Sequence, residues 1–179
     1  MKRLSLILLI LSFLVIVFNG CATIPSGYKP MTNKEGEQLY IVQDKFNDVS
    51  FIRHKYFFGI FAKTPIEIYE IENRALRIVF KYVGSDWIFF TKAIILGSQG
   101  DKIEFNFKSY DKKTDVDKNV YESIDLLLTD SEVNKILSIL SESGIKKVRL
   151  SGKYYKDYEL NNNKVVALIE IIKHYLKNK

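Results

Sequence analysis

The sequence predicts an α+β domain in which an antiparallel β-sheet meander is covered by two helices late in the chain. Three observations predict this class. Apolar and polar residues alternate through most of residues 51–107, turn residues separate these runs, and helical spacing appears only after residue 129. Alternation of this kind is typical of antiparallel strands that pack one face on a core and expose the other to water. We therefore expect strands first and helices last.

The predicted strands are runs in which an apolar side chain recurs at every second residue. Within residues 75–83, for example, Leu76, Ile78 and Phe80 share one face. Turn residues follow, so we expect strands 75–83, 87–96 and 102–107 to form one meander. The other predicted strands are 51–58, 66–71, 120–128, 147–151 and 153–160, and the polar run 109–119 is predicted to be a loop.

Two helices are predicted after these strands. Thr129 and Glu132 have the spacing of a capping box, in which each side chain accepts a hydrogen bond from the other residue's amide. Gly144 supplies a left-handed residue to end this first helix. Asparagines at 161–163 can cap the final helix. Apolar residues recur at helical spacing in both, so each helix should place one face on the sheet.

The first 21 residues have the pattern of an export signal. Lys2 and Arg3 precede an apolar run over residues 4–18, and Gly20 and Cys21 follow it. This run is shorter than the roughly 20 residues needed to cross a bilayer, so we predict cleavage rather than a membrane span.

The segment Phe18-Asn19-Gly20-Cys21 resembles the lipobox of bacterial lipoproteins. The resemblance implies that residues 1–20 are removed and that Cys21 is lipidated with acyl chains such as palmitate. It also implies a place in the cell envelope, and Ala22 favours the outer membrane in a Gram-negative cell. Phe18 and Asn19 depart from the family's preference for leucine and a small residue.

The mature part of the chain divides into a tether and one domain. Residues 21–36 contain two of the three prolines and several small polar residues, which bury too little apolar surface to offset the entropy of ordering. We expect a lipidated cysteine and flexible tether over 21–36, and a single globular domain over 37–179. Residues 75–178 resemble uncharacterised bacterial exported proteins in the order of their strands and helices, a resemblance that implies no activity.

Composition excludes several classes of function. The chain carries 27 basic and 21 acidic side chains, for a net charge of +6. The basic residues are scattered among acidic neighbours, whereas a nucleic-acid binder gathers them into a patch, so no nucleic-acid partner is expected. Cys21 is the only cysteine, which excludes disulfides, cysteine-ligated zinc and a cysteine nucleophile from the domain. No cofactor is predicted.

Polar residues that could perform chemistry have structural interpretations. Asp115, Asp117 and Asn119 alternate as in a calcium loop, but Val120 and Leu126 occupy the glycine and glutamate positions of that loop. We therefore predict no metal site and interpret the segment as a solvated loop.

The histidines and the paired acidic residues are predicted to lie at the surface. His54 lies between basic residues in a strand, and His174 lies near a helix end. Alternation places Glu70 and Glu72 on one solvated face of their strand. None of them is predicted to be catalytic.

Aromatic residues are the remaining candidates for a site. Trp87, Tyr154 and Tyr155 belong to runs with aromatic residues on both strand faces, more than a one-sided core requires. They line either a contact surface for a partner or ligand, or a second buried layer.

The sequence thus predicts a membrane-anchored envelope lipoprotein with a non-catalytic binding domain. Its acyl chains would contact the membrane, and its partner would be an unidentified envelope protein or a small apolar ligand. A ligand carrier would need a cavity between sheet and helices. The other alternative is an envelope hydrolase, with His54 or His174 bonded to a carboxylate inside a cleft.

Overall fold

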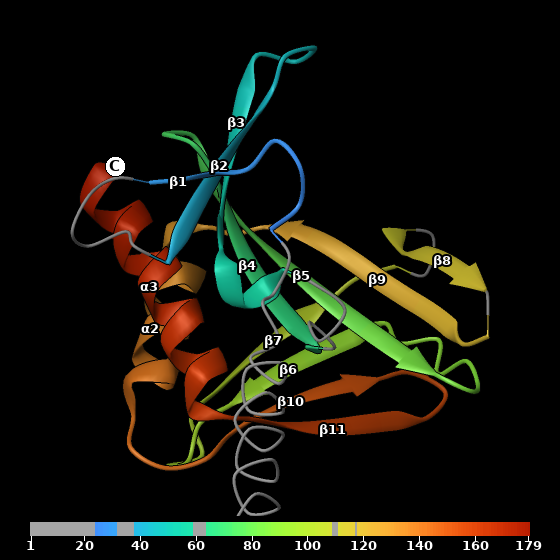
Figure 1. Ribbon diagram of the computed structural model, residues 1–179. Coiled ribbons are helices and arrows are strands. Elements are labelled where there is room, and N and C mark those ends of the chain that lie inside the picture. Colours follow the sequence, from blue (N-terminus) through green and yellow to red (C-terminus); the bar gives the residue numbers. More distant parts are fainter. Residues whose placement is uncertain (1–23, 32–37, 59–63, 109–110, 117) are drawn as a thin grey trace, which may run out of the picture.

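Two antiparallel sheets and two helices make up the computed structural model, which describes residues 24–31, 38–58, 64–108, 111–116 and 118–179. Both helices come from the later part of the chain and lie together on one side of the sheets (Figure 1). The predicted α+β class, with antiparallel strands and two late helices, is confirmed. The predicted signal peptide and Cys21 lie outside the described residues.

The larger sheet has seven strands in the order β1-β2-β3-β4-β5-β9-β8. They are β1 (Lys29–Pro30), β2 (Leu39–Asp44), β3 (Val49–His54), β4 (Ile66–Ile71), β5 (Ala75–Gly84), β8 (Lys113–Val116) and β9 (Val120–Leu127). Strands β1 to β5 follow the chain order, so they form a meander. The predicted strand over 51–58 is wrong after His54, because the Tyr56 amide donates to His54 Nδ1 and a 3₁₀ turn (Lys55–Phe57) begins.

The smaller sheet has the order β11-β10-β6-β7. Its strands are β6 (Lys92–Leu96), β7 (Lys102–Asn106), β10 (Lys146–Ser151) and β11 (Tyr155–Leu160). The prediction of one meander through 75–83, 87–96 and 102–107 is wrong, because β5 pairs with β4 and β9 whereas β6 pairs with β7 and β10. Residues 87–91 are not a strand but carry the chain from one sheet to the other.

Two segments that the sequence predicts to be irregular contribute strands. β8 lies within the predicted loop 109–119 and pairs with β9. β1 lies within the predicted tether 21–36, where Lys29 pairs with Ile41 and Pro30 with Tyr40. Composition did not reveal either strand, because each is short and is stabilised by the backbone of its neighbour.

Both predicted helices are confirmed. Helix α2 (Asp130–Ser141) starts at the capping box: Thr129 Oγ1 accepts from the Glu132 amide at 3.3 Å, and the Glu132 carboxylate accepts from the Thr129 amide at 2.7 Å. Helix α3 (Asn162–Asn178) is capped by Asn161, whose side chain accepts a first-turn amide. Gly144 has the left-handed conformation expected of it, with φ of 90°, in the turn that follows α2.

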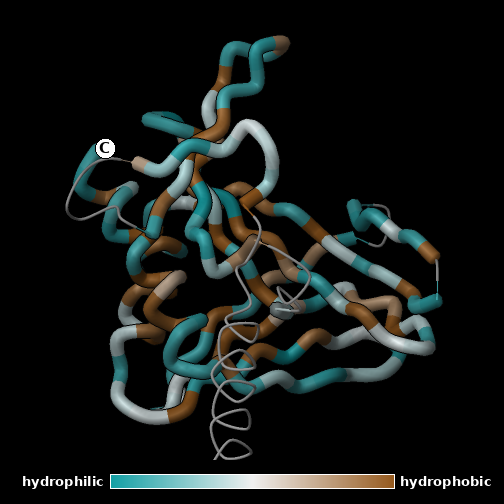
Figure 2. The backbone as a smooth tube through the Cα atoms, in the orientation of Figure 1, coloured by the Kyte–Doolittle hydropathy of each residue, from teal (hydrophilic) through white to brown (hydrophobic). Residues whose placement is uncertain are grey.

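The hydrophobic core lies where the helices cover the sheets. Helix α3 contacts β3, β4, β5 and α2, and its Leu168, Ile171 and Ile172 are fully buried. Hydrophobic and hydrophilic residues alternate along the strands (Figure 2), so the larger sheet has one face on this core and an outer face. Within the described part of the chain, neither helix has the length and apolar character needed to cross a bilayer.

Candidate functional site

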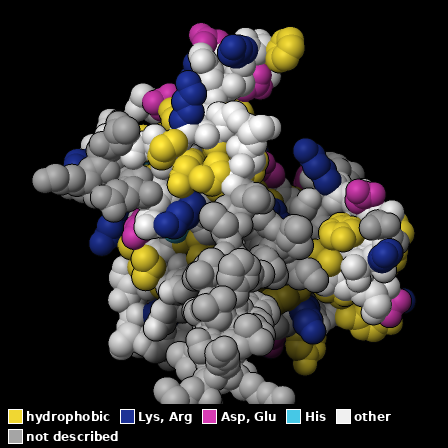
Figure 3. All heavy atoms as spheres, viewed as in Figure 1, with side chains coloured by type: hydrophobic (Ala, Val, Ile, Leu, Met, Phe, Trp, Pro, Cys, Tyr) yellow, Lys and Arg dark blue, Asp and Glu magenta, His cyan; other side chains and the backbone are white. Residues whose placement is uncertain are grey.

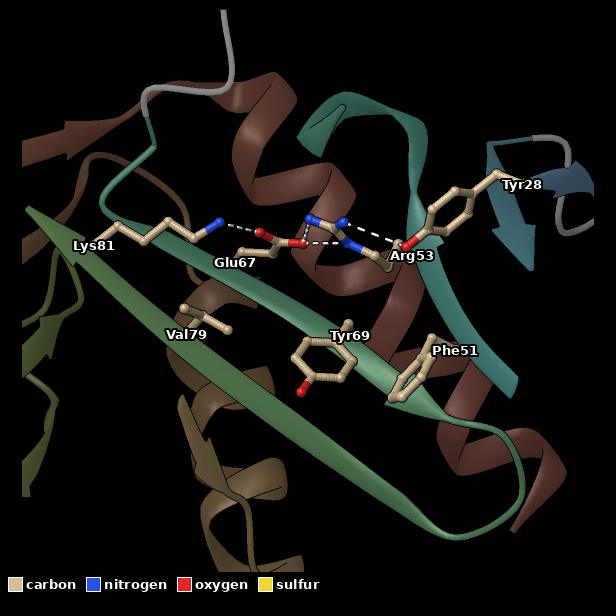
Figure 4. A pocket seen from close by; sticks show the side chains of 7 residues that line it. All are labelled: Tyr28, Phe51, Arg53, Glu67, Tyr69, Val79 and Lys81. Carbon is tan, nitrogen blue, oxygen red and sulfur yellow. Dashed lines mark hydrogen bonds and ion pairs between the residues drawn. The ribbon is translucent and has the colours of Figure 1, made fainter. Parts of the chain in front are cut away.

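An open pocket of about 230 Å³ lies on the outer face of the larger sheet (Figure 4). It is formed by the residue before β1 and by strands β3, β4 and β5. Its lining residues are Tyr28, Phe51, Arg53, Glu67, Tyr69, Val79 and Lys81. Strand periodicity explains this grouping, because residues two apart on each strand point to the same face and the three strands are adjacent.

Charged side chains form one row of the pocket. Glu67 is almost completely buried, and its carboxylate accepts from Arg53 Nε at 2.6 Å and from Lys81 Nζ at 2.5 Å. Arg53 Nη1 also donates to the Tyr28 hydroxyl at 3.4 Å. Burial alone would lower the pKa of Arg53, but Glu67 and Tyr28 raise it, so the guanidinium stays charged. The row holds two cations and one anion.

Apolar surface forms the second row, from Phe51, Tyr69 and Val79 (Figure 4). The Phe51 and Tyr69 rings meet edge to face, with centroids 6.0 Å apart. The Tyr69 hydroxyl donates to Asp125 Oδ2 at 2.7 Å, and burial together with this bond raises the pKa of Tyr69. Tyr69 is therefore a neutral wall of the pocket.

His54 is buried, so the prediction of a surface histidine is wrong. Its Nδ1 accepts from the Tyr56 amide, so Nε2 carries the proton and donates to Glu170 Oε2 at 2.9 Å. Burial lowers the pKa of His54, and Glu170 offsets only part of this effect. The cause of the burial is α3, which covers the face of β3 that carries His54.

His174 and Glu70 also depart from the surface positions predicted for them. Glu70 is buried, and its carboxylate accepts from His174 Nδ1 at 2.7 Å. The face of β4 that carries Glu70 is covered by α3, whereas Glu72 is half-buried in the turn after β4. Both imidazole–carboxylate pairs thus lie on the helix-covered face, and the pocket lies on the opposite face.

The predicted aromatic residues lie near the smaller sheet and outside the pocket. Trp87 packs against the core and stacks on Phe89, with ring centroids 5.9 Å apart. Tyr154 is exposed in the turn between β10 and β11, and Tyr155 is exposed at the start of β11, where Arg149 lies 4.6 Å from its ring centroid. Trp87 is thus packed against the core, whereas Tyr154 and Tyr155 are exposed.

Other apolar side chains are exposed at loops. Phe46 is fully exposed in the turn between β2 and β3. Figure 3 shows an apolar side chain projecting at the tip of this hairpin, with basic and acidic side chains beside it. This aromatic residue was not among the sequence candidates.

Glu122 of β9 is a buried polar residue that sequence reasoning missed. Its carboxylate accepts from the amides of Ile88, Phe89 and Phe90 at 2.8, 2.9 and 3.1 Å, and from Lys112 Nζ at 2.5 Å. Phe89 has φ of 51°, which turns three successive amides toward one carboxylate. Glu122 therefore holds the segment that links the two sheets.

No group of histidine, cysteine and acidic side chains in the described ranges is arranged to hold a metal ion. Asp115 is exposed in β8, and Asp117 of the candidate calcium loop lies outside the described residues. Cys21 also lies outside them.

The pocket residues were not predicted, although their pattern is present in the sequence. Arg53, Glu67 and Lys81 occupy positions that alternation assigns to the outer face, and each has an apolar residue two positions away. The signal was weak because charged residues on an outer face are ordinary.

The fold and this site define an α+β domain with a charged and apolar pocket on an open sheet. The chain matches no protein-family model, no curated protein and no solved structure.

Proposed function

We propose that this protein is a bacterial envelope lipoprotein, anchored by an acylated Cys21, whose domain binds a ligand without transforming it. The observation that carries this proposal is the position of the pocket. Tyr28 contributes to its lining and follows Cys21 by only seven residues. An extended chain spans at most about 3.5 Å per residue, so the pocket would lie within roughly 25 Å of the anchor.

The construction of the pocket supports binding. All of its residues except Tyr28 come from three adjacent strands, and Arg53 and Lys81 are held in place by the buried Glu67 carboxylate. Side chains ordered before a ligand arrives reduce the entropy lost on binding. A few polar groups beside an apolar wall are typical of ligand sites.

The exposed aromatic pair favours a second candidate function, the binding of an envelope protein. Tyr154 and Tyr155 are 57% and 65% exposed, and Lys153 and Arg149 lie beside their rings. Aromatic residues and arginine are enriched in protein interfaces. Tyr155→Ala would weaken crosslinking of the chain to a partner in intact cells and leave ligand binding in the pocket unchanged.

The anchor is tested by Cys21→Ser. We expect this variant to lose labelling by radioactive palmitate and to leave the membrane fraction, because the thiol that accepts the acyl chain is gone. Thr23→Ser is the matched control and should keep both. Palmitate labelling and membrane recovery of Cys21→Ser at the level of the unsubstituted chain would contradict the anchor.

A further inference from the structure

The pocket has more positive charge than its internal ion pairs require. Arg53 and Lys81 share one carboxylate, so this cluster carries a net charge of +1. The neighbouring Arg77 and Asp125 form a balanced pair. Buried charges are normally compensated, and one cation would suffice for Glu67.

The surplus positive charge is on the accessible side. The Glu67 side chain is 2% exposed, whereas those of Arg53 and Lys81 are 25% and 34% exposed. A molecule that enters the pocket therefore meets the two cations before it meets the carboxylate. The arrangement attracts an anion.

Hydrogen-bond donors also remain for such an anion. An ammonium group has three N–H donors and a guanidinium has five. Among the described residues, Lys81 Nζ donates only to Glu67, and the Tyr28 hydroxyl accepts from Arg53. Two N–H groups of Lys81 and the hydroxyl proton of Tyr28 are thus available from opposite ends of the charged row (Figure 4).

The apolar row lies directly below the charged row in Figure 4. Phe51, Tyr69 and Val79 form it, and the Tyr69 hydroxyl is already bonded to Asp125. The volume of about 230 Å³ is below the range of about 300–1,000 Å³ for drug-sized ligands. A small molecule with a charged head and a short apolar body matches both rows.

We infer that the pocket binds an oxyanion joined to an apolar body, with the oxyanion at the Lys81 end of the charged row and the body on Val79 and Tyr69. This inference rests on the proposed function, because it names the ligand class of the same site. The oxyanion belongs either to a free phosphate monoester or to the headgroup of an anionic lipid. Both sources present anionic phosphate oxygens next to an apolar body.

The test uses phenyl phosphate as the probe, with inorganic phosphate and phenol as its two separate halves. The full chain isolated from cells, in phosphatidylcholine nanodiscs, is titrated by calorimetry. We expect phenyl phosphate to bind at least about tenfold more tightly than either half, because charge-assisted bonds and apolar contact then act together. Phenol binding as tightly as phenyl phosphate would overturn the inference.

Lys81→Gln tests the charge. It should weaken phenyl phosphate binding about tenfold, whereas Lys156→Gln, an equal charge change at an exposed position of β11, should not. Arg53 still pairs with Glu67 in Lys81→Gln, so we expect this variant to fold. Tyr28→Phe, which removes a donor at the opposite end of the charged row, should leave the affinity unchanged. Unchanged affinity in Lys81→Gln would show that the oxyanion lies elsewhere.

A second set of nanodiscs distinguishes the two sources of the oxyanion. If phosphatidylglycerol in the same nanodisc lowers the apparent affinity for phenyl phosphate, the lipid headgroup competes for the pocket. An unchanged affinity assigns the site to a free phosphate ester. The palmitate experiment tests only the anchor. If the chain is recovered without acyl groups, the same titrations are made in buffer instead of nanodiscs. Failure of the anchor proposal therefore leaves the test of the ligand class intact.

Discussion

Neighbouring residues on one strand of this protein point to opposite faces of the sheet, and their side chains have different roles there. Arg53 points into the pocket, and the next residue, His54, bonds to Glu170 of α3. On β4, Glu67 lies in the pocket, and three residues later Glu70 bonds to His174 of α3. Ionisable groups are therefore buried on both faces of the sheet. On the outer face Arg53 and Lys81 pair with Glu67, and on the helix-covered face the two imidazoles pair with carboxylates.

The burial of His54 predicts a loss of stability in acid. Its pKa in the folded state is lowered by burial from the ordinary value of 6.5, although Glu170 opposes the shift and Lys55 adds to it. As the pH falls below about 6.5, the unfolded chain takes up this proton first, so the free energy of unfolding decreases until the folded-state pKa is passed.

His54→Gln measures this contribution. Glutamine retains an N–H donor toward Glu170 but does not titrate, so the free energy of unfolding should depend less on pH between pH 7 and pH 5 than in the unsubstituted chain. Urea denaturation at several pH values provides the measurement. The slope with pH is compared rather than the absolute stability, because glutamine also loses the acceptor for the Tyr56 amide. Identical slopes would mean that His54 is not held neutral by the fold.

At the scale of elements, the segment between β5 and β6 shows how one side chain determines a path of the backbone. The alternation of residues 87–96 predicts a strand, but the amides of residues 88–90 donate to Glu122 and cannot join a strand ladder. The strand β6 therefore begins only at Lys92, in the other sheet. A carboxylate that is distant in sequence overrides a local preference for extended structure.

Glu122→Gln is expected to lower the free energy of unfolding by about 3 kcal/mol, because an amide N–H2 group then faces donors in a buried site. Urea denaturation measures the change. Glu159→Gln is the matched control: Glu159 is exposed and lies 3.5 Å from Lys147, so its loss should cost less than about 1 kcal/mol. Equal effects of the two substitutions would show that Glu122 does not hold the linking segment.

The first turn of α2 allows a prediction that follows from sequence and structure alike. Thr129→Ala removes the acceptor for the Glu132 amide and should cost about 1 kcal/mol in the free energy of unfolding. Thr129→Ser keeps the hydroxyl group and should restore most of this stability. Thermal or urea denaturation of the alanine and serine variants distinguishes the loss of the capping hydrogen bond from the effect of a smaller side chain. A serine variant as unstable as the alanine variant would argue against the cap.

At the scale of the whole molecule, β1 joins the proposed anchor to the proposed site. The tether predicted over 21–36 would separate the domain from the membrane, but pairing of Lys29 with Ile41 brings the chain onto the sheet much earlier. The Tyr28 ring then packs on Phe58, with centroids 4.7 Å apart, and its hydroxyl completes the charged row. The proposed anchor, Cys21, thus precedes the first residue of the pocket by only seven positions in the sequence.

Local patterns in the sequence determined the class of this protein's fold. The alternation in residues 66–71 and 75–83 predicted β4 and β5, and the capping box at Thr129 predicted the start of α2. These features depend on residues that are near one another in the chain, so periodicity and capping chemistry suffice to predict them.

Only the tertiary structure decided which strands pair, which polar residues are buried and where the pocket lies. The division into two sheets depends on β9 and β10, which come late in the chain, and the burial of His54 and Glu70 depends on α3. Arg53, Glu67 and Lys81 meet only because three strands align in register. Such pairings depend on contacts between distant segments, which no local pattern of residues records.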